Sequence, residues 1–386
     1  MREYIHATIS STLSWAGNIY DLLLLTYVYS YLMQAFSLNY FDISVLFALG
    51  LIGRVAGGVI FGRLADSMGR KPVMEIGTGG YALFQGLMAL SPNAVFLFLF
   101  RALEGVFMGA AWTAGMVLAY EKAPVSLRGL ITGVYQAGYG IGYALTGLTY
   151  FIFLPHLSQD WRLFLLTGAL PLALVPYVHL KVGESIKKLE RTERPRYRDY
   201  LGVLIKATLA MSGMFIAYFS VFGNYTTIAL DYARMSPYTL ATLMLVANLI
   251  LAGAFVLYGR LADSFDKRKL IIISVIGLVA SAPFSVPLFR PLMNAAFMFA
   301  GTTAFSFFAG FWPLMPLLLA DSVPIEVRGF LSGFSYNVGG LMGGVADIVL
   351  GVISSVYGYS ALAKAIDGFV FFALVLVFVS VITWPK

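Results

Sequence analysis

Four ionisable residues lie within stretches of sequence that are otherwise apolar, namely Asp21, Arg54, Arg101 and Glu104. Asp21, Arg54 and Glu104 each fall about ten to twelve residues into such a stretch, which is near mid-membrane at roughly 1.5 Å per helical residue. Arg101 lies about a turn further out than Glu104 on the same predicted helix. Charges at this depth are costly and by default indicate function. Burial disfavours the charged form of a carboxyl group and a nearby arginine favours it, so the protonation of these acids would depend on how close the arginines lie. The alternative is a structural ion pair that joins two helices.

Arg54 is the basic residue whose surroundings best suit a ligand. Glycines flank it at positions 50, 53, 57 and 58, so a ligand or a neighbouring helix can approach closely. Its guanidinium group suits a carboxylate, although Glu104 or Asp21 is an alternative partner. If both acids were protonated, Arg54 and Arg101 would leave two uncompensated positive charges, which an anionic substrate would partly neutralise. If Glu104 stays ionised against Arg54, this preference for an anion shrinks.

The remaining candidate substrate ligands are polar and aromatic. The C-terminal half has no comparable charge at mid-membrane, because Asp347, Lys364 and Asp367 are expected nearer the outer helix ends. We therefore expect the N-terminal half to carry protons and recognise charge, and the C-terminal half to shape specificity. A polar or aromatic residue inside a membrane helix, taken alone, more often serves packing than ligand contact. Besides Arg54 and Arg101, the candidate substrate-binding residues are Asn18, Tyr20, Gln136, Tyr139, Asn248, Trp312 and Asn337.

Membrane-spanning helices are needed to position these side chains. Of the 386 residues, 59% are hydrophobic and only 12% are charged, which excludes soluble enzymes, disordered chains and fibrous proteins. A spanning helix needs about 20 mostly apolar residues. The first apolar run contains Asn18 and Asp21 and is expected to be a retained helix rather than a cleaved signal. The twelve predicted helices have the approximate bounds 10–33, 43–64, 72–91, 94–120, 129–153, 161–181, 201–228, 238–261, 270–289, 292–320, 329–353 and 361–384.

Basic residues are unevenly distributed around these helices. With the N-terminus in the cytoplasm, the inner connections and tails hold 20 of the 26 Lys and Arg, and the outer connections hold four. The positive-inside rule therefore predicts that both termini are cytoplasmic. This distribution also explains the net charge of +7 without nucleic-acid binding. The chain has no cysteine and three widely separated histidines, so we expect neither a metal site nor a cofactor.

Two sequence patterns occur twice in the chain. Gly-Arg-Leu-Ala-Asp-Ser begins at Gly62 and again at Gly259, 197 residues later. A Pro-x-x-x-Arg-Gly pattern begins at Pro124 and again at Pro324, 200 residues later. The chain is therefore expected to contain two copies of a six-helix unit, 1–181 and 201–386. The polar, basic stretch 182–200 is predicted to be a cytoplasmic linker near anionic headgroups.

The duplicated patterns resemble the signature loops of the major facilitator superfamily. Gly62-x-x-x-Asp66-x-x-Gly69-Arg70-Lys71 resembles the family's signature loop, and Glu121-x-x-Pro124-x-x-x-Arg128-Gly129 is similar to the branch of sugar porters and organic-acid/proton symporters. The resemblance implies two six-helix bundles around a central cavity that opens alternately to each side. It also implies that these charges latch the outward-facing state, the alternative being a solvated loop that only sets topology. The gating residues implied are Gly62, Asp66, Arg70, Lys71, Glu121, Arg128, Asp263, Asp321 and Arg328.

Two shorter patterns concern the proton. Asn18-Ile-Tyr20-Asp21 resembles the acidic first-helix motif of proton-coupled sugar and organic-acid symporters. Arg101-x-x-x-Gly105-x-x-x-Gly109 resembles the arginine motif of the same proteins. The resemblance implies that Asp21 and Arg101 form the proton-coupling pair. Glu104 joins them as a proton-coupling candidate because of its depth alone.

The sequence thus predicts an all-α polytopic membrane protein with twelve transmembrane helices in two pseudo-symmetric six-helix bundles. We expect a monomer in the cell membrane that is not an enzyme and whose partners are a small molecule, protons and the lipid bilayer. The expected function is proton-coupled symport of a small organic anion, such as a monocarboxylate or sugar acid. A proton-coupled or facilitative sugar transporter is the alternative. A membrane enzyme or receptor lacks support, because no nucleophile–base set or phosphate loop is present.

Overall fold

The fold is helical throughout the part of the chain that the computed structural model describes, which is residues 3–185, 196–223, 225–287 and 294–385. Residues 186–195 of the predicted linker lie outside the described residues. The helices are α1 (Glu3–Leu24), α2 (Tyr29–Phe36), α3 (Tyr40–Met68), α4 (Arg70–Ala89), α5 (Ala94–Lys122), α6 (Arg128–Phe153), α7 (Leu157–Leu166), α8 (Leu174–Lys181), α9 (Leu201–Phe222), α10 (Tyr225–Thr227), α11 (Pro237–Ala262), α12 (Lys267–Ser285), α13 (Ala295–Phe308), α14 (Leu314–Ser322) and α15 (Ile325–Ile382).

Twelve membrane crossings account for these helices. Eight helical stretches of the described residues are long and apolar enough to cross a membrane. Two of them, Val125–Lys181 and Ile325–Ile382, have 57 and 58 residues, enough for two crossings each. The second reverses at Gly358, whose φ of 71° lies in the left-handed region that favours glycine. The more polar α1 with α2, and α4, complete the predicted twelve.

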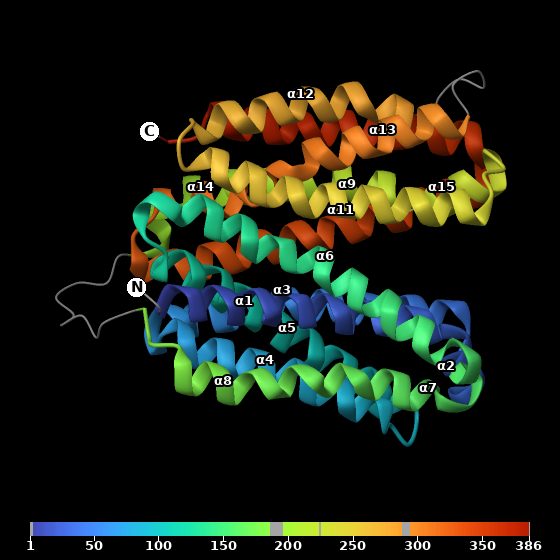
Figure 1. Cartoon of the computed structure of the whole chain (residues 1–386), viewed down its shortest axis with the longest axis horizontal. Coiled ribbons are helices and arrows are strands. Elements are labelled where there is room, and N and C mark those ends of the chain that lie inside the picture. The colour runs from blue at the N-terminus through green and yellow to red at the C-terminus, as the bar shows by residue number, and fades with distance from the viewer. Residues whose placement is uncertain (1–2, 186–195, 224, 288–293, 386) are drawn as a thin grey trace.

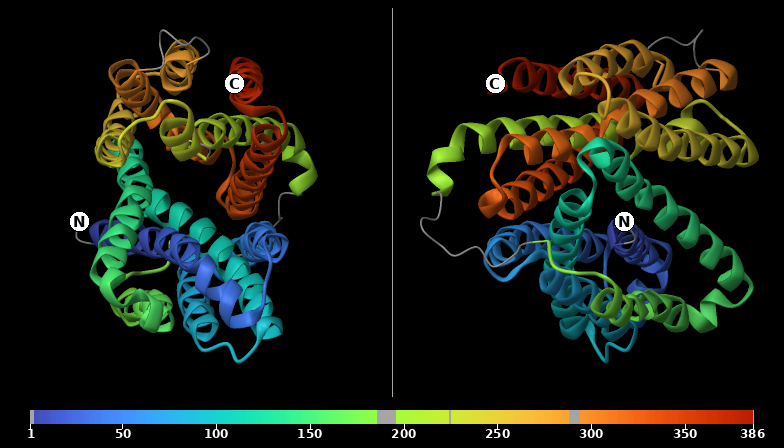
Figure 2. Two further views of the ribbon diagram at one scale, coloured as in Figure 1. Left: turned by 90° about the vertical axis from the view of Figure 1, so that its right-hand side faces the viewer. Right: turned by 60° about the vertical axis from the view of Figure 1, so that its left-hand side comes forward.

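The crossings form two bundles. Figure 1 shows α1 to α8 grouped on one side and α9 to α15 on the other, and both views of Figure 2 keep this division. The start of α1 and the end of α15 lie at the same end of the molecule (Figure 1). We call this the latch end, because α3 and α11 also finish there with Asp66 and Asp263 near their last residues. The predicted fold class is therefore confirmed.

Several crossings are broken where the sequence predicted continuous helices. The first changes to a 3-10 turn at Leu25–Val28 between α1 and α2. The sixth has a 3-10 segment at Thr167–Ala173, which contains Pro171, a residue without a backbone N–H. The seventh was expected to reach residue 228, but α9 ends at Phe222 and a π-helical turn follows at Ile228–Tyr232. These breaks bring irregular backbone close to the interior polar residues described below.

Glycine contacts join the two bundles at two helix crossings. Where α3 crosses α15, a Cβ placed on Gly58 would lie 2.6 Å from the carbonyl oxygen of Gly333. Where α6 crosses α11, a Cβ on Gly259 would lie 2.4 Å from the carbonyl oxygen of Gly129. Side chains would not fit at either crossing, so the backbones of the two halves touch directly. The two crossings repeat one arrangement, as the duplicated sequence predicts.

Candidate functional site

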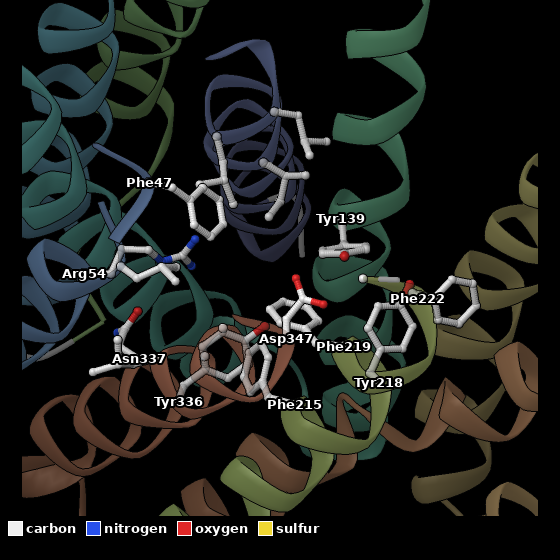
Figure 3. A pocket seen from close by; sticks show the side chains of 18 of the residues that line it. Phe47, Arg54, Tyr139, Phe215, Tyr218, Phe219, Phe222, Tyr336, Asn337 and Asp347 are labelled. Carbon is white, nitrogen blue, oxygen red and sulfur yellow. The ribbon is translucent and has the colours of Figure 1, made fainter. Parts of the chain in front are cut away.

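A cavity of about 200 Å³ lies between the two bundles. Its described lining comes from α1 and the 3-10 turn after it, α3 and α6 of the first bundle, and from α9 and α15 of the second. Most of the wall is aromatic or aliphatic, and Figure 3 shows the rings of Phe47, Phe215 and Tyr218 facing the space. Such a cavity, with apolar walls and a few polar groups, suits a small ligand. The polar lining residues are Thr26, Arg54, Tyr139, Tyr143, Tyr218, Tyr336, Asn337 and Asp347.

Arg54 supplies a positive charge to this cavity. It lies in the middle of α3, and its guanidinium group points into the space (Figure 3). The residue is 8% exposed, and its Cζ lies 5.5 Å from the ring centroid of Trp15, in cation–π range. In the described part of the chain, no carboxylate forms an ion pair with Arg54. It is therefore a buried cation that an anionic ligand group could neutralise.

Asp347 brings a second charge into the same cavity, from the C-terminal half. Figure 3 shows its carboxylate directed into the space from α15. Sequence analysis placed this residue near an outer helix end and gave it no role. The spacing of its neighbours holds the missed signal, because Asn337, Gly340 and Gly344 line the cavity with it at intervals that share one helix face.

Arg101 and Glu104 pair with each other behind the cavity wall. Arg101 Nη1 donates to Glu104 Oε2 at 2.8 Å, and both side chains are 0% exposed. A Cβ on Gly50 would lie 2.6 Å from Arg101 Nη2, so the glycine makes room for the guanidinium group. Arg101 Nε and Nη2 and Glu104 Oε1 have no hydrogen-bond partner within the described residues. Neither residue belongs to the described lining, so Arg54 is the arginine that faces the cavity.

Asp21 is a fully buried carboxyl group to which no described residue donates a hydrogen bond. The residue is 0% exposed, and neither carboxylate oxygen has a partner in the part of the chain that the structure describes. It lies against the broken sixth crossing, because a Cβ on Gly168 would lie 2.7 Å from Asp21 Oδ1. The charges of Glu104 and Arg101 are close enough to act on it. The three predicted proton-coupling residues therefore share one buried region next to the cavity.

Two predicted ligands of α1 hold helices together. Asn18 Nδ2 donates to the carbonyl oxygen of Met108 at 2.9 Å. The hydroxyl of Tyr20 lies 2.5 Å from that of Thr167 and 3.1 Å from that of Thr149. Both α1 residues are buried and lie outside the described cavity lining. They connect α1 to α5, α6 and the sixth crossing, so they position the helix that carries Asp21.

The other predicted ligands divide into two groups. Tyr139 and Asn337 line the cavity, and Asn337 Nδ2 donates to the carbonyl oxygen of Gly333. Gln136 and Trp312 lie behind the wall, where both donate to the hydroxyl of Tyr336, at 3.4 and 3.2 Å. Asn248 donates to the carbonyl oxygen of Met244 in its own helix and lies outside the described lining.

At the latch end, a carboxylate of each half accepts hydrogen bonds from a helix of the other half. Asp66 accepts from the backbone N–H groups of Gly329 and Phe330 at 2.8 and 2.9 Å. Asp263 accepts from those of Gly129 and Leu130 at 2.7 and 3.1 Å. Carboxylates at helix N-termini satisfy free donors and complement the helix dipole. The two bundles are therefore joined at this end by two equivalent contacts.

Further ion pairs reinforce the contact made by Asp66. Arg70 pairs with Asp66 at 2.9 Å and with Glu121 at 3.3 Å, and it also donates to the carbonyl oxygen of Ile325. Glu121 in turn pairs with Arg328 of the second half at 2.9 Å. Asp66, Arg70 and Glu121 are at most 4% exposed, so water screens these charges weakly.

The remaining candidate gating residues lie around this network. Asp321 accepts from the hydroxyl of Tyr120 across the halves and pairs with Lys267 at 3.1 Å. Arg128 lies over the ring of Tyr120, with its Cζ 4.6 Å from the centroid. Gly62 permits the close approach of α15, because a Cβ there would lie 2.8 Å from Phe330 Cα. Lys71 instead donates to His179 at 2.7 Å within the first half.

Replacing Asp66 with alanine is expected to open the latch end. The change removes both hydrogen bonds to α15 and the pair with Arg70, and loss of such a cap costs about 1 kcal/mol, or roughly fivefold in the closed-state population. Thr113, which is buried beside Gly333, provides the reporter. In a Thr113→Cys background of this cysteine-free chain, an impermeant thiol reagent applied to the latch end should label about fivefold faster.

Asp42→Ala is the matched control for this substitution. Asp42 caps the opposite end of the same α3 helix, where it is exposed and accepts from the backbone N–H of Asn39. Equal labelling rates in the Asp66 and Asp42 variants would show that the Asp66 contact does not hold the halves together.

The arrangement suits binding and transfer of a proton and a small ligand. Within the described ranges, no group of three His, Asp or Glu side chains could hold a metal ion. The cavity, the buried acids next to it and the contacts at one end share the interface between two similar halves. Such an interface can open alternately at either end when the halves rock against each other.

Comparisons with known proteins agree with this architecture. A family model described as Major Facilitator Superfamily matches residues 7–347. The sialic acid transporter NanX of Escherichia coli (strain K12) is 25% identical over 91% of this chain and 88% of its own length. A probable 4-methylmuconolactone transporter of Cupriavidus pinatubonensis is 23% identical over 96% and 88%. The solved proton:xylose symporter XylE superposes with a TM-score of 0.83 at 16% identity, covering 97% of this chain and 94% of that one.

Proposed function

Because the chain belongs to the Major Facilitator Superfamily, whose members are transporters and not enzymes, we propose that it carries a small organic anion across the cell membrane in symport with protons. The observation that carries this proposal is Arg54. It presents a buried guanidinium group to the cavity, and none of the ion pairs in the described structure involves it. An isolated buried charge is costly, so a ligand carboxylate would be favoured there as a charge partner.

The relatives support an acid as the cargo. One curated relative carries sialic acid, and another is a probable carrier of 4-methylmuconolactone. The walls of the cavity support a small acid more than a sugar, because a sugar needs many hydrogen-bonding side chains and most of this lining is apolar. The likeness to the xylose symporter concerns the fold alone. A sugar transporter therefore remains the alternative outcome of the test below.

We propose that Asp21 couples the movement of protons to the transport of the substrate. Its carboxyl group has no hydrogen-bond donor within the described residues, while Arg101 and Glu104 form a pair close by. If the helices shift between the two states, the distance from Asp21 to this pair changes, and with it the preference for the charged or neutral carboxyl group. Asp21 would then load a proton in one state and release it in the other.

The orientation and assembly belong to the same proposal. The latch end carries the duplicated basic loops, so we place it, together with both termini, in the cytoplasm. The contacts at this end then close the cytoplasmic side, and we assign the arrangement described above to the state that faces outward. The cavity is formed by one chain, so a monomer is the expected working unit.

Uptake into liposomes tests the function directly. Purified protein is reconstituted, an acid-outside pH gradient is imposed, and uptake of monocarboxylates, sugar acids and neutral sugars is followed. We expect a carboxylate to be concentrated inside and a protonophore to abolish the concentration. Uptake of neutral sugars without any carboxylate would replace the proposal with the sugar-transporter alternative. Carboxylate accumulation that persists with the protonophore would contradict proton coupling.

A further inference from the structure

The two charged side chains of the cavity lie at different depths and come from different halves. Gly58 of α3 packs against Gly333 and Asn337 of α15, and Leu51 packs against Gly344. The helices therefore run in opposite directions, and Arg54 lies level with about residue 340. Asp347 is about two helical turns beyond this level, which is roughly 10 Å at 1.5 Å per residue. The cavity thus has a positive pole toward the latch end and a negative pole toward the opposite end.

The surroundings of Asp347 suit a hydrogen-bond donor. The carboxylate lies against the last turn of α9, because a Cβ on Gly223 would approach it. The carbonyl oxygens at a helix C-terminus carry partial negative charge, so this helix end adds to the negative potential. A second anionic group would be repelled at this pole, whereas a hydroxyl or ammonium group would be attracted.

Aromatic side chains separate the two poles. Phe215, Tyr218 and Phe219 of α9 face Trp15 and Tyr139 across the cavity lining, and Phe215 lies 5.0 Å from the ring of Tyr336 in an edge-to-face arrangement. Rings of this kind favour a flat or apolar ligand body, which makes offset or edge contacts with them. A flat dianion would fit this wall, but its second carboxylate would be repelled at the negative pole.

From this polarity we propose that Asp347 selects substrates that carry a single carboxylate at one end and a hydrogen-bond donor at the other, and that it rejects dianions. The inference rests on the proposed function, because it assumes that the carboxylate binds at Arg54. Arg54 then accounts for the requirement for a carboxylate, and Asp347 selects among the molecules that carry one. The two halves then supply charges of opposite sign to the cavity, with Arg54 from the first half and Asp347 from the second.

Three probes of similar size test the selection, namely benzoate, 4-hydroxybenzoate and the dianion terephthalate. Their affinities are measured for the reconstituted full chain at neutral pH. We expect 4-hydroxybenzoate to bind about tenfold more tightly than benzoate, as a hydrogen bond to a charged acceptor predicts, and terephthalate to bind most weakly. In Asp347→Asn, the advantage of the hydroxyl should fall several-fold and terephthalate should gain affinity. Benzoate should bind as before, which also shows that the variant is folded.

Each outcome decides between the two proposals. If no probe and no other carboxylate binds the native protein, the anion function itself fails. If the native protein binds all three probes equally, the function stands and the selection by Asp347 is wrong. If Asp347→Asn weakens all three by the same factor, Asp347 supports the structure or the transport cycle and does not select the substrate. Asp367→Asn, a carboxyl variant of the same half outside the described cavity lining, should leave the order of the three affinities unchanged.

Discussion

Replacing Asp21 with asparagine is expected to abolish accumulation driven by a proton gradient while counterflow exchange of substrate continues. Asparagine keeps the size of the side chain but cannot take up or release a proton. Net transport then loses its driving force, and the concentration ratio should fall to unity. Exchange requires no net proton movement, so the cavity and its alternating access should still work. Both quantities are measured in the same liposomes, with labelled substrate and either an imposed pH gradient or a preloaded unlabelled pool.

Asp367→Asn is a close control for the Asp21 variant. Asp367 lies in the last crossing, and its two carboxylate oxygens also lack hydrogen-bond partners within the described residues. It is remote in sequence from the Arg101–Glu104 pair, so its loss should leave accumulation intact. Continued accumulation in Asp21→Asn would remove Asp21 from the coupling mechanism. Loss of accumulation in both variants would indicate a general effect of buried carboxyl groups.

Replacing Arg54 with glutamine is expected to weaken carboxylate binding by roughly 100-fold, as the loss of a bidentate, charge-assisted contact predicts. Glutamine fills much of the same space, so the fold should persist and the thermal unfolding midpoint should change little. Arg54→Lys keeps the charge but loses the planar fork, and should recover part of the affinity. Binding is followed by displacement of a labelled carboxylate from the purified protein.

Variants of two other arginines separate substrate binding from stabilisation of the fold. Arg63 lies in the same α3 helix but covers the ring of Phe330 at the latch end, so Arg63→Gln should change carboxylate affinity far less than Arg54→Gln does. Arg101→Gln removes the partner of the fully buried Glu104, which should lower stability by several kcal/mol. Sequence analysis grouped Arg101 with Arg54 as a substrate ligand, and these measurements separate the two. Unchanged affinity in Arg54→Gln would overturn the proposed anion site.

Much of the fold follows from the sequence because the bilayer imposes simple rules. Apolar length specified the twelve crossings, and the duplicated patterns located the charged residues that the structure brings together at the latch end. The positions of the helix breaks were harder to predict from the sequence. Pro171 marks one of them, but the end of α9 at Phe222 and the π-helical turn that follows depend on packing between helices. Hydropathy averages over such details.

Which side chains line the cavity depends on how each helix is rotated about its own axis, as well as on how deep each residue lies in the membrane. Depth alone grouped Arg54 and Arg101, yet only Arg54 belongs to the described cavity lining, because Arg101 turns toward Glu104 one turn along its own helix. Depth also placed Asp347 near an outer end, although its helix face carries it into the cavity. Tyr20 and Asn18 show the same limit, since their polar groups find partners on neighbouring helices. These choices are made by contacts between segments far apart in the chain.

The exchange of helix caps between the halves has an energetic consequence for affinity. Asp66 and Asp263 each cap a helix of the opposite bundle, and two caps together contribute on the order of a few kcal/mol. A ligand that binds only one of the two states, at 100 times its dissociation constant, stabilises that state by about 2.7 kcal/mol, so occupancy is sufficient to redistribute the two states. Any affinity measured from one face of the membrane therefore includes the free energy of closing the cavity at the opposite face. Loosening a cap far from the cavity would then change the apparent dissociation constant without altering a single ligand contact.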